Sequence, residues 1–236
     1  MTFSFDDAVA QALEVRTSGR WEALNDKIKA LAAHPAPHAP WYVRTFGALV
    51  GETFGEFSCL EKAYEERHFK EVPLLAWRAR NLLELSIWAR YFSTSIENAT
   101  RIYADAGRDA RELFQRFADW GRQENYPEEW VDALERGRGD LVRRAADQGV
   151  DNLTDPFTRV EAAARECGLQ EIFQLLNKLL SKFAHPTAMM ILRSPEDDEG
   201  EKKRRAFCYG IGCLAFQNGI VALERVQFDP QPRADN

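Results

Sequence analysis

The side chains best suited to chemistry lie in one segment late in the chain. Asn177, Ser181 and His185 recur at every fourth position and therefore share one side of a helix, with Lys178 and Lys182 beside them. Histidine suits a general base near neutral pH, and lysine can stabilise the negative charge of a phosphate. The same pattern is also typical of the solvent-facing side of an ordinary amphipathic helix.

A second polar pair lies inside an apolar segment. Residues 73–91 carry apolar side chains around the whole helix axis, which predicts a helix in the middle of a bundle. Arg80 and Glu84 are four residues apart within it. Because an isolated buried ion costs several kcal/mol, this pair is either a structural ion pair or part of a cleft that holds a ligand.

Two short motifs point to a metal or a cofactor but lack the context that each requires. Glu65 and His68 form one E-x-x-H, whereas a carboxylate-bridged di-iron bundle needs a second copy and two further glutamates. Residues 210–215 match G-x-G-x-x-A, but no strand precedes them. We therefore predict neither a metal site nor a cofactor.

Four cysteines, Cys59, Cys167, Cys208 and Cys213, show no C-x-x-C spacing. Each lies in an apolar helical stretch, so we expect buried free thiols.

Three glycines, Gly47, Gly51 and Gly55, form a stripe along one predicted helix. Each costs about 1 kcal/mol relative to alanine in a helix interior. The stripe therefore predicts that another helix packs closely against it.

Helical periodicity continues through almost the entire chain, and no alternating pattern is long enough for a sheet. The sequence predicts an all-α fold, a helical bundle of about seven main helices with a short N-terminal helical extension. Thr94 and Glu97 form a predicted capping box, and residues 194–205 form a charge run that indicates a solvated loop. The expected main helices are 40–68, 74–91, 94–120, 125–149, 155–168, 169–184 and 206–226.

The composition favours a globular protein. Of the 236 residues 45% are apolar and 29% charged, and the net charge of −6 disfavours non-specific coating of nucleic acid but leaves room for a local basic cleft. The N-terminus does not resemble a signal peptide, and no apolar run approaches the length of a membrane span. We expect a cytoplasmic protein with no membrane partner.

The predicted organisation is an extension (1–32), a Pro-rich linker (33–40), a bundle (41–226) and a polar tail (227–236).

Two motifs together resemble a known group of proteins. Arg80-x-Leu-x-Glu84 and, about a hundred residues later, Leu-Ser-Lys-Phe-Ala-His-Pro at 180–186 resemble an uncharacterised bacterial all-helical family. That family is similar to HEPN domains, which occur in toxin–antitoxin and phage-defence systems. The resemblance implies a metal-independent ribonuclease that uses an arginine and a histidine four to six residues apart at a dimer interface. In this chain the best match runs from Lys178 to His185, with lysine where arginine is expected.

The first functional hypothesis follows from this resemblance, which implies RNA as a partner and a homodimer or a cognate partner protein. His185 would remove a proton from a ribose 2′-hydroxyl, and Lys178 or Lys182 would stabilise the phosphate. Asn177 and Ser181 would contribute binding contacts.

The second hypothesis is a non-enzymatic helical interaction or small-ligand-binding module. Its pocket would surround Arg80 and Glu84. The acidic composition favours this hypothesis, whereas the basic late helix favours the first.

Overall fold

A computed structural model of the chain describes residues 5–34, 39–65, 71–150, 153, 157–185 and 198–227. These residues form nine helices and no strand, which confirms the all-α bundle: seven main helices follow two N-terminal ones. In chain order they are α1 (Phe5–Thr17), α2 (Arg20–Ala32), α3 (Ala39–Glu65), α4 (Glu71–Phe92), α5 (Ile96–Gln123), α6 (Glu128–Asp147), α7 (Val160–Glu166), α8 (Gln170–Ala184) and α10 (Asp198–Glu224).

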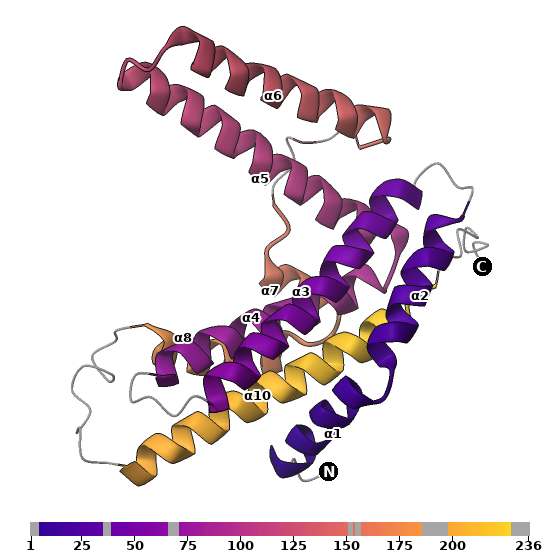
Figure 1. Ribbon diagram of the computed structural model, residues 1–236, viewed down its shortest axis with the longest axis vertical. Coiled ribbons are helices and arrows are strands. Elements are labelled where there is room, and N and C mark those ends of the chain that lie inside the picture. The colour runs from indigo at the N-terminus through magenta and orange to yellow at the C-terminus, as the bar shows by residue number, and fades with distance from the viewer. Residues whose placement is uncertain are drawn as a thin grey trace.

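Helix α4 is the centre of the main body (Figure 1). It packs against α3, α5, α7, α8 and α10, and Leu75, Ala79 and Leu82 on it are completely buried. The predicted central position of this apolar helix is confirmed. Helices α1 and α2 contribute Val15, Leu24 and other side chains to the same core.

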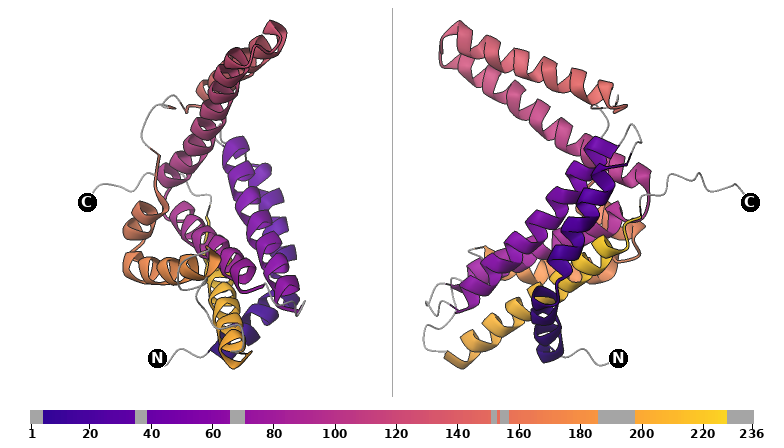
Figure 2. Two further views of the ribbon diagram at one scale, coloured as in Figure 1. Left: turned by 90° about the vertical axis from the view of Figure 1, so that its left-hand side faces the viewer. Right: turned by 45° about the vertical axis from the view of Figure 1, so that its right-hand side comes forward.

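Helices α5 and α6 form an antiparallel hairpin, here called the arm, that projects from the body (Figures 1 and 2). Near its base a small second core contains Ala104, Ala145, Val150 and Leu153. At its tip the rings of Trp120, Tyr126 and Trp130 pack together, with centroids 5.0–6.3 Å apart. The arm therefore has little core of its own.

Several helix boundaries differ from the expected ones. The cap of α5 is Ser95, whose hydroxyl accepts from Asn98 N at 3.2 Å, whereas the Thr94 hydroxyl donates to Arg90 O. Helix α6 begins at Glu128, since Asn125 adopts a left-handed conformation with φ 57°.

Helix α10 begins at Asp198, eight residues before its predicted start. The basic residues that we expected in a loop belong to its first turns, and both arginines among them have a partner. Arg204 pairs with Glu201 at 3.3 Å, and Arg205 donates to Tyr64 O at 2.7 Å.

The predicted linker and tail fall only in part within the described ranges. Ala33 and His34 follow α2, and Ala39 and Pro40 open α3, while residues 35–38 lie outside the described residues. Of the tail only residue 227 is described. Helix α7 begins at Val160, and the predicted start at residues 155–156 lies outside the described part of the chain.

The expected close packing on the glycine stripe is wrong for the part of the chain that the structure describes. A Cβ atom added at Gly51 or Gly55 would meet no described atom within 4 Å, and one at Gly47 would meet only Ile28 at 3.8 Å. The close approach occurs at Gly212 on α10 instead, where an added Cβ would overlap Leu60 Cδ2 and lie 3.5 Å from Ala79 Cα.

The cysteines also differ in environment. Cys208 and Cys213 are buried as expected, Cys167 is half-buried, and Cys59 is exposed, contrary to the prediction. Cys59 lies on a face of α3 that no described helix covers, next to the exposed Ser58.

Helix α10 is long and apolar enough to cross a membrane by length and composition. We expected no such segment, because Gln217 and Asn218 interrupt the apolar run. In the fold 72% of its most apolar stretch is buried, and the Gln217 side chain donates to Ala8 O at 2.6 Å. A core helix of a bundle has the same properties.

Candidate functional site

Helix α8 positions most of the residues that sequence reasoning selected. It docks on α4 through the completely buried Phe173 and Leu180. It ends at His185, whose backbone is extended (φ −106°, ψ 154°) because the residue before a proline disfavours the α region. The helix end therefore fixes the backbone of His185 at the surface.

A hydrogen bond joins the two candidate groups across α4 and α8. The Arg80 Nε atom donates to Asn177 Oδ1 at 2.8 Å, while Arg80 Nη2 lies 3.1 Å from Glu84 Oε1. Asn177 thus orients the guanidinium that pairs with Glu84. The structure therefore brings Asn177 next to Arg80 and Glu84, from which it is far apart in the sequence.

The ion pair between Arg80 and Glu84 is confirmed, but it is not deeply buried. Each of the two side chains is 30% exposed to solvent. A part-exposed pair at this spacing contributes about 0–1 kcal/mol to stability. This exposure leaves the outer side of the guanidinium accessible to solvent.

The remaining selected residues continue along α8. Lys178, Lys182 and His185 are exposed, and Ser181 is half-buried. We call Arg80, Glu84, Asn177, Lys178, Ser181, Lys182 and His185 the polar strip. His185 is eight residues, or about 12 Å of helix rise, beyond Asn177.

This length limits which residues can act on one group. Lys182 is one helical turn from His185, whereas Arg80 binds Asn177 at the other end of the strip. The strip thus suits an extended ligand with several charges, with Arg80 and His185 at different points along it.

The apolar pattern of α8 is only partly a guide to what is buried. Periodicity places Ile172 and Leu175 in the buried stripe, but these side chains are 48% and 56% exposed. Helix α8 packs against α4 and α7, and this contact covers the side of Phe173 and Leu180, with Leu176, Phe183 and Ala184 partly buried against the same core. The apolar stripe of the sequence is wider than the face that its neighbours cover.

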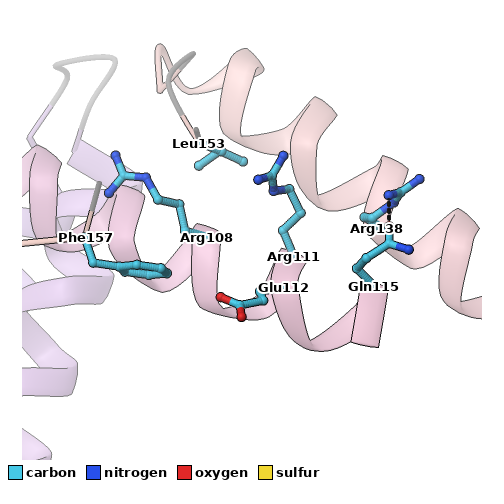
Figure 3. A pocket seen from close by; sticks show the side chains of 7 residues that line it. All are labelled: Arg108, Arg111, Glu112, Gln115, Arg138, Leu153 and Phe157. Carbon is cyan, nitrogen blue, oxygen red and sulfur yellow. Dashed lines mark hydrogen bonds between the residues drawn. The ribbon is translucent and has the colours of Figure 1, made fainter. Parts of the chain in front are cut away.

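Three pockets within the described ranges lie away from the polar strip. One of about 330 Å³ opens on the arm, where Arg108, Arg111 and Glu112 come from α5 and Arg138 from α6 (Figure 3). A second, of about 630 Å³, lies between α3, α5 and α6, and a third lies along α2. None of the three is lined by Arg80 or Glu84.

Most charges in the arginine-lined pocket of the arm are already paired. Arg108 pairs with Asp105, and Arg138 binds Gln115 and pairs with Glu135. Burial raises the pKa of Asp105, although its carboxylate also accepts from Thr158 N at 3.1 Å. These bonds tie the segment after α6 to α5, so the pocket has a structural role. The sequence gives no sign of this pocket. Acidic and basic residues alternate along α5 and α6, a pattern that is typical of a helix face exposed to solvent.

The possible metal ligands among the described residues do not gather in space. Within the described ranges, no group of three or more His, Cys, Asp and Glu side chains could hold a metal ion. Of the E-x-x-H motif, Glu65 ends α3, and His68 lies outside the described residues.

Comparison with protein families, with curated proteins and with solved structures finds no match to this chain.

Proposed function

We propose that the protein is a HEPN-like module that binds single-stranded RNA along the polar strip, in a toxin–antitoxin or phage-defence setting. The observation that carries this proposal is the hydrogen bond between Arg80 and Asn177. It joins on one surface the two segments whose motifs resemble HEPN relatives.

Charge and exposure along α8 support an anionic ligand. Lys178, Lys182 and His185 are exposed on one helix, in a chain whose net charge is −6. Lysine side chains bind phosphates as point charges, and an arginine can bind one bidentately. A strand that runs along α8 would contact Arg80 at one end and His185 at the other.

If the strip cleaves RNA, His185 is the general base and Lys182 is the nearer cation for the phosphate. His185 would take the proton of a ribose 2′-hydroxyl, and the resulting oxygen would attack the adjacent phosphorus. Lys182 would stabilise the charge that develops on the phosphate oxygens. The resemblance implies that this chemistry needs no metal.

The alternative is a small-ligand or interaction module centred on Arg80 and Glu84. In its favour, the guanidinium is part-exposed. However, its Nε and one terminal nitrogen are already engaged by Asn177 and Glu84. The RNA proposal also draws on Lys178, Lys182 and His185, which are exposed along α8 and which the alternative does not use.

Binding of a short, fluorescently labelled single-stranded RNA, measured by anisotropy over a range of salt concentrations, tests the proposal. The double variant Lys178→Ala/Lys182→Ala should bind more weakly, and the negative slope of log affinity against log salt should become shallower by about 0.7 for each phosphate that the variant no longer neutralises. Lys29→Ala on α2, which also removes an exposed lysine, is the matched control and should leave affinity unchanged.

Cleavage is followed in the same RNA by gel electrophoresis. His185→Ala should abolish cleavage while leaving binding and the circular dichroism spectrum intact, and the wild type should cleave in the presence of EDTA. A wild-type protein that neither binds nor cleaves single-stranded RNA contradicts the proposal. Binding without cleavage restricts it to an RNA-binding module.

A further inference from the structure

The cavity of about 630 Å³ between α3, α5 and α6 lies on a different surface from the polar strip. Its volume is within the range of about 300–1,000 Å³ that ligand pockets occupy. The helices that line it are the ones that meet where the base of the arm leaves the body (Figure 1). Nothing in the RNA proposal uses it.

Small residues create the space. Ala48 of α3 and Ala106 and Ala110 of α5 all line the cavity, and Gly107 and Gly137 lie at the contact of α5 with neighbouring segments. A Cβ atom added at Gly107 would lie 3.0 Å from Leu153 Cδ2, and one at Gly137 would lie 3.0 Å from Phe114 Cε1. The two glycines thus let Leu153 and Phe114 pack against the helices and leave the space open.

The remaining walls are mainly apolar. Large side chains complete the lining, and they come from all three helices and from the segment that follows α6. They are Leu49, Ile102, Tyr103, Phe114, Leu141, Val150 and Leu153. Walls of this kind accept an aliphatic or aromatic group. Binding is favourable because apolar surface is removed from water.

Two arginines are among the residues that line the cavity. Arg44 of α3 and Arg144 of α6 both line it and are exposed. Neither has a hydrogen bond or ion pair with any residue that the structure describes. Arg116, Arg122 and Arg138 on the arm pair with carboxylates, whereas Arg111 and Arg136 resemble Arg44 and Arg144 in having no such partner among the described residues.

The charges that line the cavity select the charge of its ligand. Glu52 of α3 is the one acidic side chain among the described lining residues, against the two arginines. The formal sum is therefore +1 (two arginines, one glutamate), which suits a monoanion better than a dianion or a cation.

We propose that this cavity binds a small amphipathic carboxylate, a medium-chain fatty acid or a compound of similar shape. The apolar part lies among Ile102, Phe114 and Leu141, and the carboxylate is bound by Arg44 and Arg144. Charge-assisted hydrogen bonds from arginine to a carboxylate give the head group its specificity.

Isothermal titration calorimetry with decanoate tests this proposal, with decylamine and decanol as the cationic and neutral probes of equal chain length. Decanoate should bind with one site per chain and should raise the melting temperature, whereas decylamine should not bind. Arg44→Gln and Arg144→Gln should each weaken decanoate binding about tenfold, the change that a loss of about 1.4 kcal/mol produces.

Two matched pairs of variants keep the test independent of folding. Ala110→Phe fills the cavity and should abolish binding, whereas Ala133→Phe, at an exposed position of α6 outside the cavity, should not. Arg136→Gln, also outside the cavity, is the control for the arginine variants. Failure of decanoate to bind, equal binding of decylamine, or affinity unchanged in Arg44→Gln and Arg144→Gln each overturns the proposal. None of these outcomes affects the RNA assay.

Discussion

At the scale of single residues, the four thiols lie in three different environments. Cys208 and Cys213 on α10 have no exposed surface, and burial raises the pKa of each from 9.0 to about 12. Cys59 on α3 is exposed, and Cys167 is half-buried. Because the thiolate is the reactive form, burial suppresses reactivity through both access and ionisation.

We therefore expect one fast thiol when the folded protein reacts with Ellman's reagent near pH 8. Cys59→Ser should remove the fast phase, while Cys208→Ala should leave it unchanged. The reaction of Cys208 and Cys213 should appear only after a denaturant unfolds the chain. Two or more fast thiols in the folded Cys59→Ser variant would contradict the buried positions on α10.

The candidate site was only partly predictable, because local sequence patterns reveal some of its contacts and not others. The pair Arg80–Glu84 follows from their spacing, because residues four apart on a helix are neighbours. The hydrogen bond from Arg80 to Asn177 joins residues 97 positions apart, and no local pattern contains that information. His185 was placed correctly at a helix end because the next residue is proline.

At the scale of elements, glycine marks a close approach on α10 and not on α3. Gly212 is in contact with Leu60 and Ala79, both completely buried. Gly51 is exposed, and a side chain there would meet no described atom within 4 Å. The sequence presents both as glycines inside helices, and only the partner helix distinguishes them.

Leucine at each position tests this difference. Gly212→Leu should lower the free energy of unfolding by about 1–3 kcal/mol or more, because overpacking separates α10 from α4. Gly51→Leu should raise it by up to about 1 kcal/mol, because leucine is the better helix former. Urea denaturation followed by circular dichroism measures both. A destabilised Gly51→Leu variant would indicate a partner on α3, such as a second copy of the chain.

Element boundaries were less predictable than the elements themselves. Periodicity located the seven main helices, but it placed the cap of α5 at Thr94 instead of Ser95. It also began α10 too late, because charged residues at 201–205 resemble a loop when their partners are unknown. Arg205 binds the carbonyl of Tyr64, which lies 141 positions away.

At the scale of the whole molecule, the protein consists of a well-packed body and a thinly packed arm. The main core draws side chains from α1 to α5, α7, α8 and α10, whereas the second core contains four buried residues among those described. The cavity lies where these two parts meet. Composition predicted a core of adequate size but not its unequal distribution, which depends on how α5 leaves the body.

The main core also contains tyrosine and cysteine side chains whose ionisation is disfavoured by burial. Their pKa values predict how stability depends on pH. Burial raises the pKa of Tyr42 and Cys208 to about 12, and it raises the pKa of Tyr209 as well. A group whose pKa is higher in the folded state than in the unfolded chain binds its proton more tightly when folded. Its contribution to stability is complete below the unfolded pKa and is lost as pH rises toward the folded pKa.

We therefore expect the free energy of unfolding to fall steadily between about pH 9 and pH 12, since the ordinary pKa of a thiol is 9.0 and that of a tyrosine is 10.0. Urea denaturation at a series of alkaline pH values, with a reducing agent present, measures this slope. Cys208→Ala removes one such group and should make the decline shallower than in the wild type. A free energy that stays constant across this range would show that these side chains ionise in the folded state as readily as in the unfolded chain, and that the core around α10 is more hydrated than the structure indicates.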